Sequence, residues 1–168
     1  MTVRFLGSGL IAFTCAWYGF SMARGLRYRR DFLREIISAI SFIGREIEYG
    51  RSRLREVFKK VEKTILTDGF FDICIENMEQ KGIRESWRLA VDDAYHRFYL
   101  TTTDKEVIGE LSNELGMSDA YRQKSAIEKT VAELEKFLND ANENYVRLSK
   151  VFRGCGVLLG VFFLIIFA

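Results

Sequence analysis

The residues best suited to catalysis or metal binding are Asp92, Asp93 and His96, which lie in one short segment. Two carboxylates beside a histidine could hold a divalent metal or perform general acid–base chemistry. On a helix, however, Asp92 and Asp93 point about 100° apart and share no site. With a single histidine in the chain, no nucleophile, base and orienting group can be assembled. We therefore interpret His96 as a surface histidine and expect a non-enzyme without cofactor or metal.

Other motifs point the same way. The cysteines Cys15, Cys74 and Cys155 are odd in number and widely spaced, with no CxxC, which argues against a disulfide framework or a zinc site. No GxxxxGK[ST] phosphate loop occurs. The net charge of +2 is too small to indicate nucleic-acid binding. Function must therefore be sought in how the chain is organised.

The two ends of the chain are its most apolar parts. Residues 5–23 and residues 154–168 carry no charge. As helices they would measure about 28 Å and about 22 Å, against a hydrocarbon thickness of about 30 Å. We predict an N-terminal transmembrane helix at 1–23, a cytoplasmic helical bundle at 24–153 and a C-terminal transmembrane helix at 154–168. The alternatives are a cleaved signal peptide ending at Ser21-Met22-Ala23 and a buried core helix in the tail.

Basic residues flank both apolar ends on the side of the middle segment. Five arginines follow the first stretch and three cations precede the second: Arg24, Arg27, Arg29, Arg30, Arg34, Arg147, Lys150 and Arg153. Positive charge stays on the cytoplasmic side of a membrane. We therefore expect a cell-membrane protein with its middle domain in the cytoplasm and both termini on the opposite side.

Small residues recur at helical spacing in both apolar ends. They are Ser8, Ala12 and Ala16 in the first and Gly156 and Gly160 in the second. Such stripes let helix backbones approach closely in lipid. They predict that the two ends pack against each other as an antiparallel hairpin.

The middle of the chain has helical periodicity throughout, and the chain contains no proline. We predict an all-α fold, an antiparallel bundle of about six helices between the two transmembrane helices. One apolar stripe runs along a helix from Leu33 to Ile47. Two separate helices are expected at Asp68–Gln80 and around Trp87. A further helix is expected to begin at a capping box formed by Thr103-x-x-Glu106. The last helix starts near Ser118.

That last helix carries a heptad seam without an error: Ile127, Val131, Leu134, Leu138, Ala141, Tyr145, Leu148 and Phe152. A heptad seam needs a partner helix. It could pack on the Leu33–Ile47 stripe of the same chain, the interpretation we favour, or on a second copy. Since only glycines separate it from the tail, this helix could continue directly into the apolar end.

Over its whole length the sequence resembles the stage III sporulation protein AB family of endospore-forming bacteria. The resemblance rests on Glu46-Ile-Glu-Tyr-Gly50 with Leu54, on Trp87, on Leu115-Gly-Met-Ser-Asp119 with Gln123, and on Gly154-Cys-Gly-Val-Leu-Leu-Gly160. The family often has proline after the Tyr-Gly turn, where this chain has Arg53.

The resemblance implies a helical domain similar to that of inner-membrane platform proteins in type II secretion and type IV pilus machines. It also implies a membrane-held platform in a channel complex between mother cell and forespore, with a cytoplasmic ATPase, other membrane subunits and lipid as partners. The predicted contact residues are Glu46, Tyr49, Asp119 and Gln123, while Gly50, Gly116 and Ser118 are expected at helix ends. The alternative is a membrane-bound adaptor that forms homo-oligomers through the heptad seam.

Overall fold

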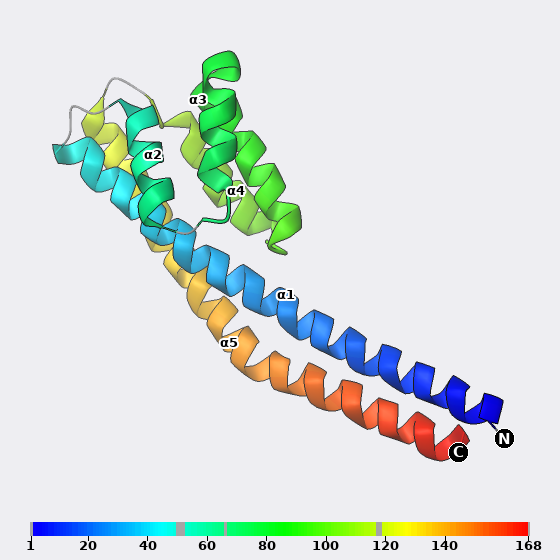
Figure 1. The fold of residues 1–168 in the computed structure, drawn as a ribbon. Coiled ribbons are helices and arrows are strands. Elements are labelled where there is room, and N and C mark those ends of the chain that lie inside the picture. Colours follow the sequence, from blue (N-terminus) through cyan, green and yellow to red (C-terminus); the bar gives the residue numbers. More distant parts are fainter. Residues whose placement is uncertain (1, 50–52, 66, 117–118, 168) are drawn as a thin grey trace. The chain divides into compact units, whose positions relative to one another are not determined.

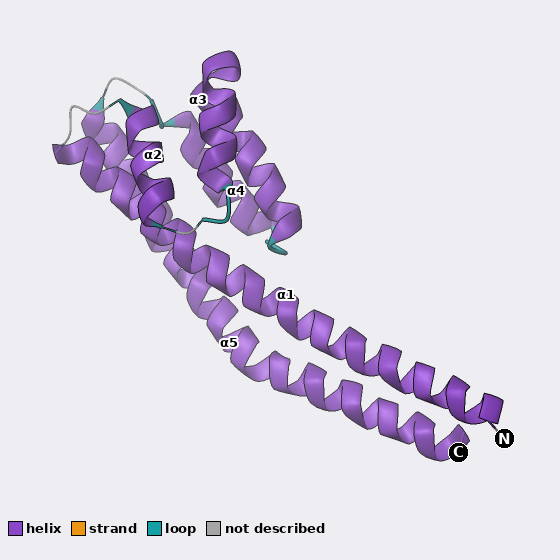
Figure 2. Cartoon of the chain, viewed as in Figure 1, coloured by secondary structure: helices purple, strands orange, loops and turns teal. Residues whose placement is uncertain are grey.

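The computed structural model describes residues 2–49, 53–65, 67–116 and 119–167, and within the two ends it describes only part of the side chains. The elements in this part of the chain are helical (Figures 1 and 2). They are α1 (Thr2–Tyr49), α2 (Leu54–Thr64), α3 (Phe70–Arg97), α4 (Thr102–Glu110), the short 3₁₀ helix η1 (Leu111–Asn113) and α5 (Ala120–Phe167). The predicted all-α class is therefore confirmed.

The chain forms two compact units, residues 1–30 with 140–168 and residues 31–139. We call them the terminal pair and the bundle. Helices α1 and α5 contribute to both units, and each runs without interruption from the bundle into an apolar end. This continuity was predicted for the tail but not for the head. The predicted domain boundaries at residues 23 and 154 lie inside these helices and stay predictions.

An aromatic cluster forms the centre of the bundle. Trp87 is fully buried on α3, with its ring 5.1 Å from that of Phe70 and 5.9 Å from that of Phe58. The indole Nε1–H donates to the main-chain oxygen of Ile108 on α4 at 2.8 Å. This bond gives the indole N–H an acceptor, so that the large ring can be buried without leaving a donor unpaired. Trp87 thus joins α2, α3 and α4.

Within the bundle, α1 packs against α5 along the predicted seam. Leu33 and Ile40 on α1 and Leu134 on α5 are fully buried, and Ile127 is nearly so. The Ile127 side chain occupies the space beside Gly44, where an added Cβ would lie only 3.0 Å from its Cγ2. Of the eight seam residues, Ile127, Leu134 and Ala141 are buried within the chain and the other five are partly exposed, which favours packing on α1 over a seam left free for a second copy.

Helix α3 contains a break at Gly82, where φ is +76° and ψ is 170°. Only glycine adopts this conformation without strain. The break separates two helical pieces, in agreement with the prediction of two helices around this point. Their N-terminal boundary differs from the prediction, because Asp68 and Gly69 both have positive φ and α3 begins at Phe70.

We predict that Gly82→Ala lowers the free energy of unfolding by about 1–3 kcal/mol. Nothing lies within 4 Å of the added Cβ, so the cost is conformational rather than steric. The matched control is Gly109→Ala inside α4, which also has open space beside it and should gain up to about 1 kcal/mol from helix propensity. Denaturant titration of both variants tests this, and equal values would contradict it.

The start of α4 corrects the predicted capping box. The box is formed by Thr101 and Asp104 rather than by Thr103 and Glu106. The Thr101 main-chain N–H donates to Asp104 Oδ2 at 2.8 Å, and the Asp104 N–H donates to Thr101 Oγ1 at 3.2 Å. The physical reason is that Thr101 is the last residue with extended backbone before the helix. At the third helical position the Asp104 carboxylate accepts from the Thr101 N–H, as a glutamate would in the usual capping box.

Among the residues that the structure describes, no helix meets the length and hydropathy expected of a membrane span. The two transmembrane helices predicted at 1–23 and 154–168 have no support from this search and stay a prediction.

Candidate functional site

The end of α1 and the start of α5 meet in the bundle, and together with the adjoining part of α2 they form a charged surface that we call the helix-end surface. Glu48 on α1 pairs with Lys124 on α5 at 2.7 Å. Glu46, one turn from the end of α1, pairs with Lys60 on α2 at 2.6 Å. Such exposed pairs contribute only about 0.2–1 kcal/mol each to the free energy of folding.

Of the four predicted contact residues, the structure places Glu46 and Asp119 on this surface. Glu46 is partly exposed and Asp119 is exposed, whereas Gln123 is only 7% exposed. Asp119 caps α5, because its Oδ1 accepts from the N–H groups of Tyr121 and Arg122 at 3.0 and 3.3 Å. The Tyr49 side chain lies outside the described part. The role of all four as contacts stays a prediction.

The predicted helix-end residues are described only in part. Gly116 has a φ of +84° and follows η1 closely, as expected for a residue that ends a helix. Gly50 and Ser118 lie outside the described residues.

The predicted packing stripes lie in the terminal pair. Ser8, Ala12, Ala16, Gly156 and Gly160 have helical backbone, but their side-chain surroundings lie outside the description. On α1 the same stripe continues to Gly19 and Ala23, and both are buried. Inside this unit α1 also contacts α5, since the Arg30 guanidinium lies 4.2 Å from the Tyr145 ring centre. The role of the five predicted residues stays untested.

Sequence reasoning missed Tyr121, which is 81% exposed at the start of α5. It lines a surface pocket of about 380 Å³ together with Glu48, Lys124, Ser125 and Glu128. A large exposed aromatic side chain with charged neighbours is typical of a protein contact. A tyrosine in the first turn after the predicted cap was the available signal, but sequence alone does not tell an exposed from a buried face there.

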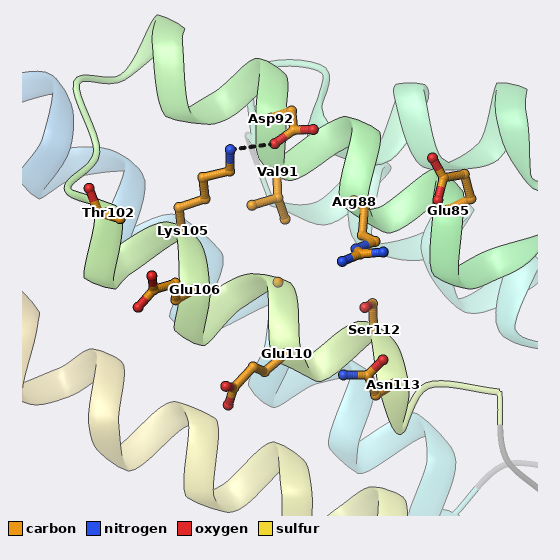
Figure 3. Close-up of a pocket in the computed structure, with 11 residues that line it drawn as sticks. Glu85, Arg88, Val91, Asp92, Thr102, Lys105, Glu106, Glu110, Ser112 and Asn113 are labelled. Carbon is orange, nitrogen blue, oxygen red and sulfur yellow. Dashed lines mark ion pairs between the residues drawn. The ribbon is translucent and has the colours of Figure 1, made fainter.

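A second hollow lies between α3 and α4, as Figure 3 shows, with a volume of about 610 Å³. Lys105 on α4 pairs with Asp92 on α3 across one end at 2.8 Å. Arg88 extends toward Ser112 and Asn113 at the other end, and Glu106 and Glu110 line the α4 side. The residues that line this hollow carry both positive and negative charges, so the lining favours neither an anionic nor a cationic ligand.

The two aspartates first considered for chemistry are engaged in ion pairs. Asp92 pairs with Lys105 and Asp93 with Arg97, and His96 is exposed with its ring against Tyr95. Over the described ranges, no group of three or more histidine, cysteine, aspartate or glutamate residues is arranged to hold a metal ion. Burial raises the pKa of the Cys74 thiol, which keeps it protonated and unreactive.

Two carboxyl groups of the bundle have raised pKa values. Burial, with Asp68 and Asp31 nearby, raises the pKa of Glu35 on α1. Burial and Asp72 raise the pKa of Glu62 on α2, although the Thr67 hydroxyl donates to Glu62 Oε2 at 3.2 Å. Both groups therefore resist ionisation more in the folded than in the unfolded chain.

We predict that Glu62→Gln stabilises the protein at neutral pH and flattens its pH dependence. The pKa of Glu62 in the folded state lies above the ordinary 4.5. As pH falls toward 4.5, the folded state therefore binds the proton before the unfolded state does, and the free energy of unfolding rises. Glutamine removes that gain while its side-chain oxygen can still accept from Thr67. Thermal unfolding at neutral and mildly acidic pH tests this, with the exposed Glu76→Gln as control. An unchanged slope in Glu62→Gln would contradict it.

These observations define an all-α protein whose first and last helices pair with each other and whose middle helices share an aromatic core. Residues 4–168 match the family described as Stage III sporulation protein AB, and the chain belongs to that family. It is 21% identical over 168 residues to the Stage III sporulation protein AB of Bacillus subtilis (strain 168), covering 98% of each chain. It is also similar in fold to a solved structure of a Stage III sporulation protein AB, with a TM-score of 0.60 and 20% identity, over 70% of this chain and 96% of that one.

Proposed function

We propose that this protein is a membrane-anchored platform of a sporulation channel complex between mother cell and forespore. Its family assigns it to sporulation. The terminal pair would be the anchor, and the bundle would face the mother-cell cytoplasm, where it docks an ATPase and contacts other membrane subunits. This is the role that the family's likeness to secretion platforms implies.

The observation that carries the proposal is the apolar surface of the terminal pair. Trp17, Tyr18 and Leu158 are 61%, 67% and 69% exposed, and Phe20, Met22 and Phe162 are also exposed. Burying large side chains of this kind is worth about 1.5–3 kcal/mol each, and contiguous exposed apolar patches mark contacts with a membrane or a partner. The uncharged ends of the sequence and their cationic flanks support lipid as the contact.

The helix-end surface is the proposed docking region for the ATPase. It combines carboxylates in weak surface pairs with the exposed Tyr121, and its disruption need not unfold the bundle. The adaptor alternative would need a free heptad seam, whereas Leu134 and Ala141 are buried within the chain.

The test is recovery of the ATPase with the tagged full chain from sporulating cells. We expect the double variant Glu46→Gln, Asp119→Asn to recover several-fold less, because two charges are lost while asparagine still caps α5. The matched control is Glu135→Gln, Asp140→Asn, two exposed carboxylates further along α5. Equal recovery by both doubles would contradict docking at the helix-end surface.

A further inference from the structure

Charge is divided unequally between the two units of the molecule. The terminal pair holds eight lysines and arginines against two acidic residues, a net charge of +6, and the bundle holds 17 against 21, a net charge of −4. The overall charge of +2 hides this separation. Electrostatic attraction to an anionic surface would therefore act on the terminal pair and not on the bundle.

The positive charge is concentrated in one band. Arg30 on α1 lies against Tyr145 on α5, and the two helices run in opposite directions in this unit (Figure 1). Residues 24–30 therefore lie level with residues 145–151. At about 1.5 Å per residue, this band is only about 10 Å tall, the scale of a lipid headgroup layer. Its members are Arg24, Arg27, Arg29, Arg30, Arg147 and Lys150.

The band borders the exposed apolar surface directly. Arg24, Arg27, Arg147 and Lys150 are exposed, and the partly exposed Arg30 lies against the Tyr145 ring. Tyr28, 43% exposed, lies within the band, and Trp17 and Tyr18 lie beyond it on the apolar side. Tyrosine and tryptophan beside cations are typical of the boundary between hydrocarbon and headgroups. In a membrane-anchored protein, such exposed cations would lie at the depth of the phosphate groups.

We propose that this basic band binds anionic phospholipid headgroups selectively, and so retains an annulus of anionic lipid around the protein. The inference rests on the proposed membrane anchorage and adds to it a lipid class and the residues that recognise it. Each cation near an anionic leaflet multiplies the binding constant for the membrane by about five. Guanidinium groups can also bind a phosphate through two hydrogen bonds.

The test uses the full chain reconstituted in vesicles of phosphatidylcholine and phosphatidylglycerol in equal parts. Discs cut from these vesicles by a maleic acid copolymer carry the protein with its surrounding lipid, whose composition is then measured. The test variant replaces four exposed cations of the band by glutamine: Arg24, Arg27, Arg147 and Lys150. The matched control replaces four exposed cations of the bundle: Lys81, Arg84, Lys129 and Lys136.

We expect a several-fold excess of phosphatidylglycerol over the bulk ratio around the wild type and the control, and the bulk ratio around the test variant. The excess should shrink at high salt. A bulk ratio around the wild type, or an excess that the test variant keeps, would overturn the inference while leaving anchorage intact. Flotation with pure phosphatidylcholine vesicles checks anchorage separately, and failure to float would overturn both.

Discussion

Trp87→Ala is expected to lower the free energy of unfolding by about 3–5 kcal/mol, the largest effect we predict for a single substitution. The side chain is fully buried among Phe58, Phe70 and Phe71. Its removal leaves a cavity between three helices and removes the donor to the Ile108 oxygen. Since a domain is stable by only about 5–15 kcal/mol, this loss is a large share of the bundle's stability.

The variant Trp87→Phe separates the cost of the cavity from the cost of the lost hydrogen bond. Phenylalanine keeps most of the ring contact but leaves the buried Ile108 oxygen without its partner, which should cost about 1–3 kcal/mol. Denaturant titration of the full chain in detergent measures both variants. A loss below about 1 kcal/mol for Trp87→Ala would show that the aromatic cluster is not the centre of the bundle.

Leu134→Ala is expected to cost about 2–5 kcal/mol, the second largest effect. Leu134 is fully buried at the middle of the seam, so its truncation opens a cavity between α5 and α1. The control is Val146→Ala on the same helix, which is 59% exposed and should change stability by less than about 0.5 kcal/mol.

The same variant distinguishes a seam within the chain from a seam between two copies. Where the seam is internal, the unfolding temperature of wild type and Leu134→Ala does not depend on protein concentration. Where the seam joins two chains, mass action makes it rise with concentration. We expect no such dependence, and a clear one would restore the adaptor alternative.

The sequence was informative wherever the signal was local or periodic. The heptad spacing located the seam through Ile127 and Leu134, glycine marked the helix end at Gly116, and Asp119 marked the start of α5. The break at Gly82 fell between two helices that periodicity had already separated. Each of these features depends on a few neighbouring residues, which is why they could be predicted.

Features that depend on contacts between distant residues, or on a choice between two capping residues, were harder to predict from the sequence. The pairs of Glu46 with Lys60 and Glu48 with Lys124 join different helices, and nothing in the local sequence specifies them. The burial of Gln123 and the exposure of Tyr121 depend on how α5 is rotated against α1. At the start of α4 both Thr101 and Thr103 could serve as the N-cap, and Thr101 does so because its backbone is extended. The arginine-rich stretch after residue 23 predicts a domain boundary, whereas α1 continues through it as one helix.

The most direct test of the central claim is the topology of the bundle in living cells. Cys15 and Cys155 are replaced by serine, and one reporter cysteine is placed at the exposed Lys136 on α5. Cys74 remains as an internal control, because it is fully buried and reacts only if the bundle unfolds. A membrane-impermeant thiol reagent is then applied to intact and to opened cells. The membrane-anchored platform predicts labelling of Lys136→Cys only after the cells are opened, whereas labelling in intact cells would place the bundle outside and contradict any contact with a cytoplasmic ATPase.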